Sequence, residues 1–192
     1  MNRRNVIKSF FLYGLAAAAM GSVFELLYLN QSIDKGYVRS KKALITALAE
    51  LIIPATDTPG ATDANVADYI IHAVMEQLST KDANNFVAGL HEVEEVAQKK
   101  MNKDFLQCSV KEQTEVLLIV RKNHAFFRRP LIKKIDRKLR GTSFFESLKE
   151  LTVVGFCSSE VGATAALRYD FIPTEYKPCI PLEKNQPGWA TK

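Results

Sequence analysis

Apolar side chains recur along this 192-residue chain with the period of amphipathic helices. They appear at steps of three and four in residues 41–53, 65–78 and 82–101, and again in a stretch that opens at Ser109. Pro54 ends the first stretch, because proline lacks a backbone N–H and crowds the preceding turn. No stretch of useful length alternates with period two, so we predict an all-α fold.

Capping residues mark where these helices begin. Ser79 can cap the stretch 82–101, and Ser109 and Glu112 have the spacing of a capping box, in which a hydroxyl and a carboxylate satisfy free N–H groups. Each helix is therefore expected to have a defined start and one buried face. Those faces comprise Leu44, Ala47, Leu48, Leu51 and Ile52 in the first helix and Phe86, Leu90, Val93 and Ala97 in the third.

A further helix is predicted from residue 144 onwards. Ser143 and Glu146 again have capping-box spacing, and the face that follows contains Phe144, Phe145, Leu148, Leu151 and Thr152. Gly155 and Gly162 then enclose a short polar stretch where the helix should continue. A glycine there costs about 1 kcal/mol relative to alanine, so we expect it to mark the close approach of another element.

Residues 1–29 have the layout of an export signal. Arg3, Arg4 and Lys8 precede an apolar run from Phe10 to Leu29, and their order resembles a twin-arginine signal, which directs folded proteins through a dedicated translocon. The alternative is a plain membrane anchor, because the run of 20 residues is long enough to cross a hydrocarbon core. Glu25 weakens that alternative. Whether the segment is cleaved stays open.

The other boundaries follow from composition. Residues 30–40 are polar and are expected to link the signal to a single helical domain over residues 41–169. Residues 170–192 contain four prolines, which exclude a long helix, so we expect an irregular tail. The tail is too apolar to hang free and is expected to lie across the chain's own helices or another subunit; its apolar side chains include Phe171, Ile172, Tyr176, Ile180 and Trp189.

The net charge of +5 is concentrated in one segment. Residues 121–140 hold nine basic side chains and one acid, Asp136, whereas the rest of the chain is slightly acidic. One interpretation is that this segment forms a surface helix, in which the aliphatic parts of the Lys and Arg side chains cover apolar neighbours. The second interpretation is that the segment contacts anionic lipid or an acidic patch on a partner. Export would exclude nucleic acid as a partner.

The sequence lacks the patterns of an enzyme that acts alone. The stretch from Ser158 to Glu160 is not a nucleophile elbow, and no strand precedes Gly155 as a phosphate loop requires. The three cysteines and three histidines have no metal-ligand spacing, and His72 is expected to be an ordinary, partly exposed side chain. We therefore predict no catalytic, cofactor-binding or metal-binding residue in this chain.

The loop from Pro54 to Asp63 is polar enough to suggest a ligand. Its Asp57, Thr58 and Thr62 could bind a sugar or an ion. Such residues more often bond to their own backbone in turns and caps, and we weight that interpretation at roughly three to one.

Two blocks each join several unusual residue types at fixed spacing. The first is IPATDTPGA at 53–61; the second is LKELTVVGFCSSEVG at 148–162, followed by YDFIP at 169–173, Tyr176 and Cys179-Ile180-Pro181. Together they resemble the gluconate 2-dehydrogenase small-subunit family. The likeness extends from about Ala43 to Pro181.

The resemblance implies an accessory role without catalysis. In that family the large subunit is a flavoprotein of the glucose-methanol-choline oxidoreductase type, which holds FAD, and a cytochrome subunit with haem often joins it. The small subunit carries the twin-arginine signal, holds the large subunit folded and flavin-loaded, and takes it across the inner membrane into the periplasm. Residues expected near the docking surface are Phe145, Leu151, Phe156, Glu160, Tyr169 and Tyr176.

Two questions stay open at this point. In an oxidising periplasm Cys157 and Cys179 could form a disulfide, and three reduced cysteines are about as compatible with the sequence; Cys179 alone matches the family's tail. The chain could also be a stand-alone, signal-anchored structural protein whose basic segment binds anionic lipid or a protein partner.

Overall fold

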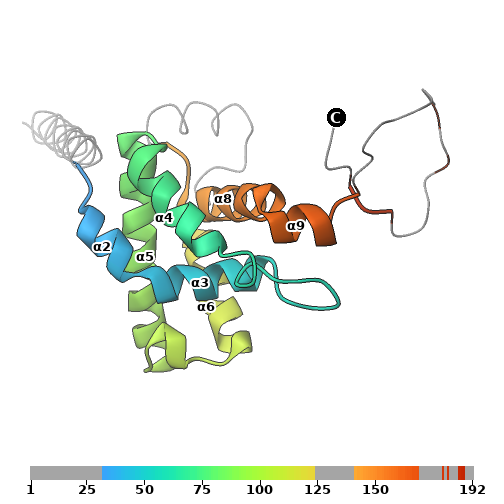
Figure 1. The fold of residues 1–192 in the computed structure, drawn as a ribbon. Coiled ribbons are helices and arrows are strands. Elements are labelled where there is room, and N and C mark those ends of the chain that lie inside the picture. The colour runs from blue at the N-terminus through green and yellow to red at the C-terminus, as the bar shows by residue number, and fades with distance from the viewer. Residues whose placement is uncertain (1–31, 124–140, 169–178, 180, 182–185, 189–192) are drawn as a thin grey trace, which may run out of the picture.

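The computed structural model describes residues 32–123, 141–168, 179, 181 and 186–188. Within these residues the chain is mainly helical and has no β-strand, which confirms the predicted all-α class. The elements, shown in Figure 1, are α2 (Lys35–Ser40), α3 (Lys42–Ile52), α4 (Val66–Glu76), α5 (Thr80–Met101), the 3-10 turn η1 (Phe105–Gln107), α6 (Val110–Asn123), α8 (Phe144–Ser158) and α9 (Glu160–Ala165).

Several predicted features lie outside the described residues. They are the export signal with Arg3, Arg4 and Lys8, most of the basic segment 121–140, and most of the tail 170–192. These features therefore stay predictions. None of the helices in the described ranges is long and apolar enough to span a membrane.

Side-chain caps start the helices where the sequence predicts them. Ser79 Oγ accepts a hydrogen bond from the Asp82 N–H at 3.2 Å. Ser109 and Glu112 bond reciprocally: the Ser109 N–H donates to the carboxylate at 2.7 Å, and the Glu112 N–H donates to the hydroxyl at 3.5 Å. Ser143 caps α8 through its hydroxyl oxygen. These bonds satisfy N–H groups that a helix start leaves free.

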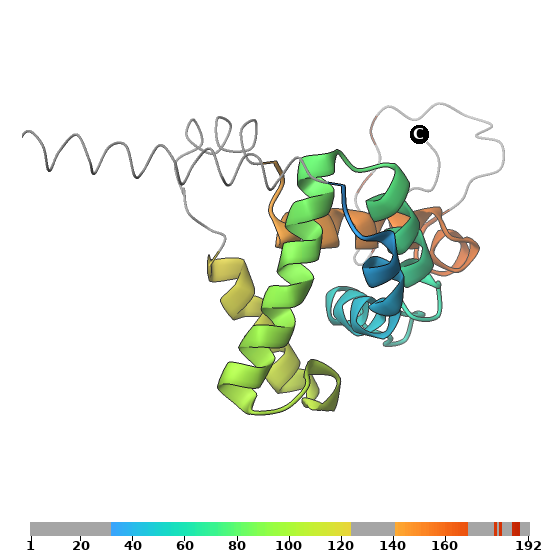
Figure 2. The same ribbon diagram turned by 90° about the vertical axis from the view of Figure 1, so that its left-hand side faces the viewer.

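The core lies where α3, α4, α5 and α8 meet, and α8 crosses the long helix α5 (Figure 1, Figure 2). At the crossing Phe144 is fully buried, and its ring centroid lies 5.2 Å from that of Phe86. Gly89 permits this approach, because a Cβ there would lie 2.1 Å from Phe144 Cγ. The predicted face of α5 is confirmed, with full burial of Phe86, Leu90, Val93 and Ala97.

The buried face of α3 differs from the prediction. Its centre is shifted towards Ile45 and Ala49, because α3 packs against both α4 and α8. Leu44 and Leu48 are buried as expected. The other predicted members of this face are half-buried; they are Ala47, Leu51 and Ile52.

The polar segment 30–40 contains helix α2 and is not simply a linker. Asp34 caps the helix by accepting hydrogen bonds from two backbone N–H groups, and Val38 is fully buried. Tyr37 stacks on His91 of α5 with 4.4 Å between ring centroids. Burial, then the charge and hydrogen bond of Glu94, raise the pKa of Tyr37 to about 12. The sequence does not predict this helix, because its few apolar residues find partners that only the fold brings near.

The prediction that glycine marks close approaches near the end of α8 is confirmed. A Cβ at Gly155 would lie 2.7 Å from Tyr69 Cδ1, so α8 packs tightly on α4 here. The helix then ends at Ser158, and Ser159 caps α9 by accepting a hydrogen bond from the Gly162 N–H at 2.9 Å. At Gly162 a Cβ would lie 2.0 Å from the Phe156 carbonyl oxygen. The two glycines thus fix where α8 and α9 lie.

Candidate functional site

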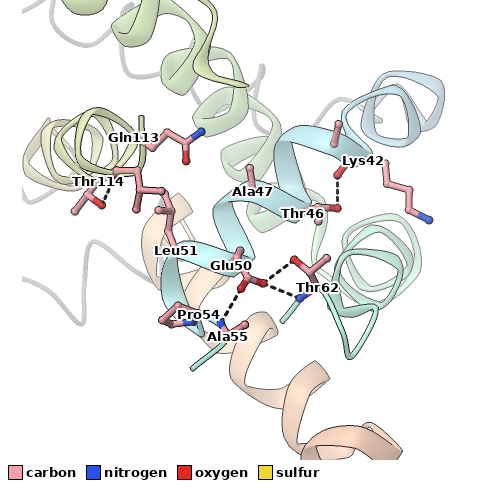
Figure 3. A pocket seen from close by; sticks show the side chains of 12 residues that line it. Lys42, Thr46, Ala47, Glu50, Leu51, Pro54, Ala55, Thr62, Gln113 and Thr114 are labelled. Atoms are coloured by element: carbon pink, nitrogen blue, oxygen red, sulfur yellow. Dashed lines mark hydrogen bonds between the residues drawn. The ribbon is translucent and has the colours of Figure 1, made fainter. Parts of the chain in front are cut away.

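Glu50, in the last turn of α3, holds the loop that follows this helix. Its Oε1 accepts a hydrogen bond from the Ala55 N–H at 2.8 Å, and its Oε2 accepts bonds from the Thr62 N–H at 2.9 Å and hydroxyl at 2.6 Å (Figure 3). Gly60 lies against the same carboxylate, since a Cβ there would lie 2.5 Å from Oε1. One side chain therefore ties the two ends of the loop to α3.

These bonds also set the charge of Glu50. Partial burial raises the pKa of its carboxyl, but the hydrogen bonds from the Thr62 hydroxyl and from the Ala55 and Thr62 N–H groups outweigh this effect. The net result is a pKa below the ordinary value of 4.5. Glu50 is therefore ionised at neutral pH, and both of its oxygens are engaged by the loop, which indicates a structural role.

We expect the loop to loosen as the solution is acidified. A carboxyl pKa that is lower in the folded state stabilises the fold above the unfolded value of 4.5, and this stabilisation is lost as the pH falls through the folded pKa. Amide hydrogen exchange at Ala55 and Thr62, followed by NMR and corrected for intrinsic rates, should therefore accelerate in acid. Glu50→Gln should accelerate exchange at the same amides at neutral pH. The glutamine side chain has only one acceptor oxygen, whereas the Glu50 carboxylate uses both of its oxygens to hold the loop.

The control for this measurement is Glu115→Gln, at an exposed glutamate of α6. It should leave both loop amides protected at neutral pH. Protection of Ala55 and Thr62 that is unchanged in acid, or in Glu50→Gln, would show that the carboxylate does not hold the loop.

An open groove of about 930 Å³ runs along α3 beside the tied loop. Figure 3 shows the α3 side chains in the middle, with Gln113 and Thr114 of α6 on one side and Thr62 on the other. Pro54 and Ala55 continue the wall formed by the loop. We call this feature the α3 groove; its α3 lining consists of Lys42, Ala43, Thr46, Ala47, Glu50 and Leu51.

The α3 groove is mainly apolar and opens to solvent. Val110, the first residue of α6, lines it and is 70% exposed, the largest fraction among the large apolar side chains of the described residues. Within the described ranges, no group of three His, Cys, Asp or Glu side chains could hold a metal ion. The apolar lining and the exposed Val110 suit contact with an apolar surface.

The loop residues proposed for a sugar or an ion are not brought together. Thr62 lines the α3 groove but is bonded to Glu50 through both its hydroxyl and its N–H. Asp57 and Thr58 are exposed and do not line the groove. The Thr56 N–H donates to the Thr58 carbonyl at 3.0 Å. These contacts favour the interpretation of the loop as turns and caps.

The residues expected near a docking surface have different environments. Leu151 and Phe156 are buried, so they pack in the core and offer little surface to a partner. Phe145 is half-buried, with the Arg121 guanidinium 5.1 Å from its ring centroid. Glu160 is exposed. Tyr169 and Tyr176 lie outside the described residues.

The three cysteines are free thiols. Cys108 is buried, and this burial raises the pKa of its thiol. Cys157 and Cys179 are exposed and are not bonded to each other in this structure, and their pairing stays a prediction. His72 is exposed, as predicted.

Sequence reasoning did not single out Glu50 or Val110. The sequence does contain a signal for Glu50. An acidic side chain in the last turn of a helix interacts unfavourably with the negative end of the helix dipole, unless nearby donors stabilise its charge. Here the compensation comes from N–H groups of the following loop. Val110 gave no such signal, since its exposure depends on how α6 packs beside α3.

The comparisons with known proteins agree with the resemblance that the two sequence blocks carry. The family described as gluconate 2-dehydrogenase subunit 3 matches residues 39–174. That range contains the tied loop, the α3 groove and α8. No curated protein and no solved structure matches the chain. By its name the family is one subunit of a dehydrogenase assembly. The chain belongs to the gluconate 2-dehydrogenase subunit 3 family.

Proposed function

We propose that this chain is the accessory, non-catalytic small subunit of a flavin-dependent dehydrogenase. The observation that carries the proposal is the family match over residues 39–174. In this proposal FAD is held by a large subunit of the glucose-methanol-choline type, and a cytochrome subunit with haem can receive its electrons. The present chain supplies no catalytic group.

The structure offers physical support for an accessory role. The titratable side chains beside the α3 groove are engaged in bonds within the chain: Glu50 holds the loop, and Lys42 pairs with Asp68 at 2.6 Å. A general acid or base needs a side chain that can reach a substrate proton. The α3 groove instead presents an apolar surface of the kind that proteins use to bind one another.

The proposed path to the periplasm depends on the predicted twin-arginine signal. Arg3, Arg4 and Lys8 would direct the folded chain to the twin-arginine translocon. A large subunit that has already bound FAD must also cross in the folded state, and it can do so when bound to this chain. The proposed role thus combines folding, flavin loading and export, with the complex on the periplasmic side of the inner membrane.

Affinity purification of the tagged chain from membranes tests this proposal. We expect a larger polypeptide to co-purify in stoichiometric amount and the eluate to show the absorption bands of oxidised flavin. Denaturation of the eluate should release FAD from the larger polypeptide. A colourless eluate with a single band would contradict the subunit role and would favour a stand-alone structural protein.

A further inference from the structure

Helix α2 is held in place by residues that lie far from it along the chain. Tyr37 stacks on His91 of α5, and its hydroxyl oxygen lies 3.2 Å from His91 Nδ1. Lys35 donates to the Glu76 carboxylate of α4 at 2.8 Å. These two partners follow the α2 residues by 54 and 41 positions. Helix α2 can therefore make these contacts only when α4 and α5 are already in place.

The short helix does not keep its shape without these contacts. It has six residues, and isolated helices shorter than about 12–15 residues are marginal in water. Asp34 caps α2 by accepting hydrogen bonds from the Gly36 and Tyr37 N–H groups, at 2.8 and 3.2 Å. A cap does not make up for the missing length. Once undocked, α2 is therefore expected to lose its helical structure.

The docked helix buries little apolar surface. Val38 is the one buried side chain among the six residues of α2, whereas α5 has seven buried residues. Tyr37 is half-buried, and Lys35 and Glu76 each keep half of their side-chain surface exposed. Exposed ion pairs contribute little to stability, and elements with few buried contacts open at a lower free energy than the core. Helix α2 is therefore held more weakly than α5.

Opening of α2 can stop at Lys41, where α2 ends and α3 begins. The side chain of Lys41 does not cap α3, but its ammonium pairs with Glu94 of α5 at 2.6 Å. Lys42 pairs with Asp68 of α4 at 2.6 Å, and Ile45 of α3 is fully buried in the core. These contacts do not involve α2. Helix α3 thus stays attached to α4 and α5 when α2 detaches.

We propose that α2 is a latch, which undocks from α4 and α5 and loses its helical structure while the rest of the domain stays folded. The six helical residues span about 9 Å when docked and up to about 20 Å when extended. The predicted signal, residues 1–29, precedes this segment, so the latch sets how far the signal stands from the folded domain. This consequence for export rests on the proposed function, whereas the latch itself does not.

Native-state hydrogen exchange of the full chain, followed by NMR, tests the latch. The Val38 and Lys41 N–H groups donate to carbonyl oxygens of the preceding turn, at 3.3 and 3.2 Å, and report on α2. Both should exchange at least about 100-fold faster than the amide of the buried Leu90 in α5, after correction for intrinsic rates. Low concentrations of urea should accelerate exchange at Leu90 and leave the two α2 amides unchanged, because a local opening exposes little surface.

Two outcomes of this measurement would overturn the latch. Equal protection and equal urea dependence at the three amides would show that α2 opens only when the whole domain unfolds. Exchange of the Val38 and Lys41 amides at their intrinsic rates would show that α2 has no docked state.

The variant Val38→Asp should undock α2 without unfolding the domain. A carboxylate at this fully buried position loses its hydration, so the open state becomes the main one. Exchange at the Lys41 amide should then be at least tenfold faster than in the wild type, while Leu90 stays protected and the far-UV circular dichroism stays helical. Arg39→Asp places the same side chain at an exposed position of α2 and should change neither amide. Unfolding of the whole domain by Val38→Asp would contradict the proposal.

Spin labels measure the change in reach directly. The labels are attached at Ser32→Cys and Gln98→Cys, two exposed positions before α2 and on α5, with both exposed native cysteines replaced by serine. Pulsed electron paramagnetic resonance should give a narrow distance distribution in the wild type and in Arg39→Asp, and a broader, longer one in Val38→Asp. The same distribution in all three would overturn the latch. Neither measurement involves the large subunit, so a chain that captures no flavoprotein would refute the subunit role and leave the latch standing.

Discussion

Phe144→Ala is expected to lower the free energy of unfolding by about 3–5 kcal/mol, the usual cost of removing a buried aromatic ring. Phe144 is fully buried at the crossing of α5 and α8, where its ring meets Phe86. The surrounding helices are expected to fill the space only in part, because both α5 and α8 also pack against other helices. Urea denaturation of the full chain, followed by far-UV circular dichroism, measures the change.

A double mutant gives the control for this prediction. Gly89→Ala alone should also be destabilising, since its Cβ would lie 2.1 Å from Phe144 Cγ. In Gly89→Ala/Phe144→Ala the added methyl group occupies part of the emptied space, so the combined loss should be smaller than the sum of the single losses. Strictly additive losses would show that the two residues do not determine the crossing together.

The second prediction with a large expected effect concerns the export of this chain. Replacing Arg3 and Arg4 together by lysine should leave both this chain and its dehydrogenase in the cytoplasm. Net charge is unchanged by this substitution, so a plain membrane anchor would insert as before, whereas a twin-arginine signal depends on the arginine pair itself. Cell fractionation with antibodies against both polypeptides, and dehydrogenase activity in the periplasmic fraction, measure the result.

Arg39→Lys, at an exposed arginine of α2, is the matched control and should be exported normally. Normal periplasmic activity in the variant that lacks both Arg3 and Arg4 would refute export of the large subunit by this chain. Export of this chain alone, with the dehydrogenase left behind, would refute joint transport but not the signal.

The sequence predicted those parts of the fold that depend on local interactions. Ser79, Ser109 and Ser143 cap helices because a hydroxyl at a helix start meets free N–H groups within a few residues. The face of α5 was also predictable, because one strongly periodic stretch leaves a single arrangement that buries its apolar residues.

The features that depend on packing were not predictable in this way. Helix α2 was missed because its stability comes from Val38 in the core and from Tyr37 on His91, which lies more than fifty residues away in sequence. The α3 groove depends on how α6 and the loop lie beside α3, which no periodicity encodes. The resemblance places Leu151 and Phe156 near a docking surface, yet both side chains are buried on α8, which packs against α4 and α5.

The two described ends of the basic segment are both attached to α5. Asn123, near the start of the segment, donates to Glu92 at 2.7 Å, and Thr142, just after it, donates its N–H to Asp82 at 2.5 Å. Ten residues of helix separate these two attachment points, which corresponds to roughly 15 Å. These two contacts therefore hold the end of α6 and the chain that leads into α8 against α5, each by a hydrogen bond of its own.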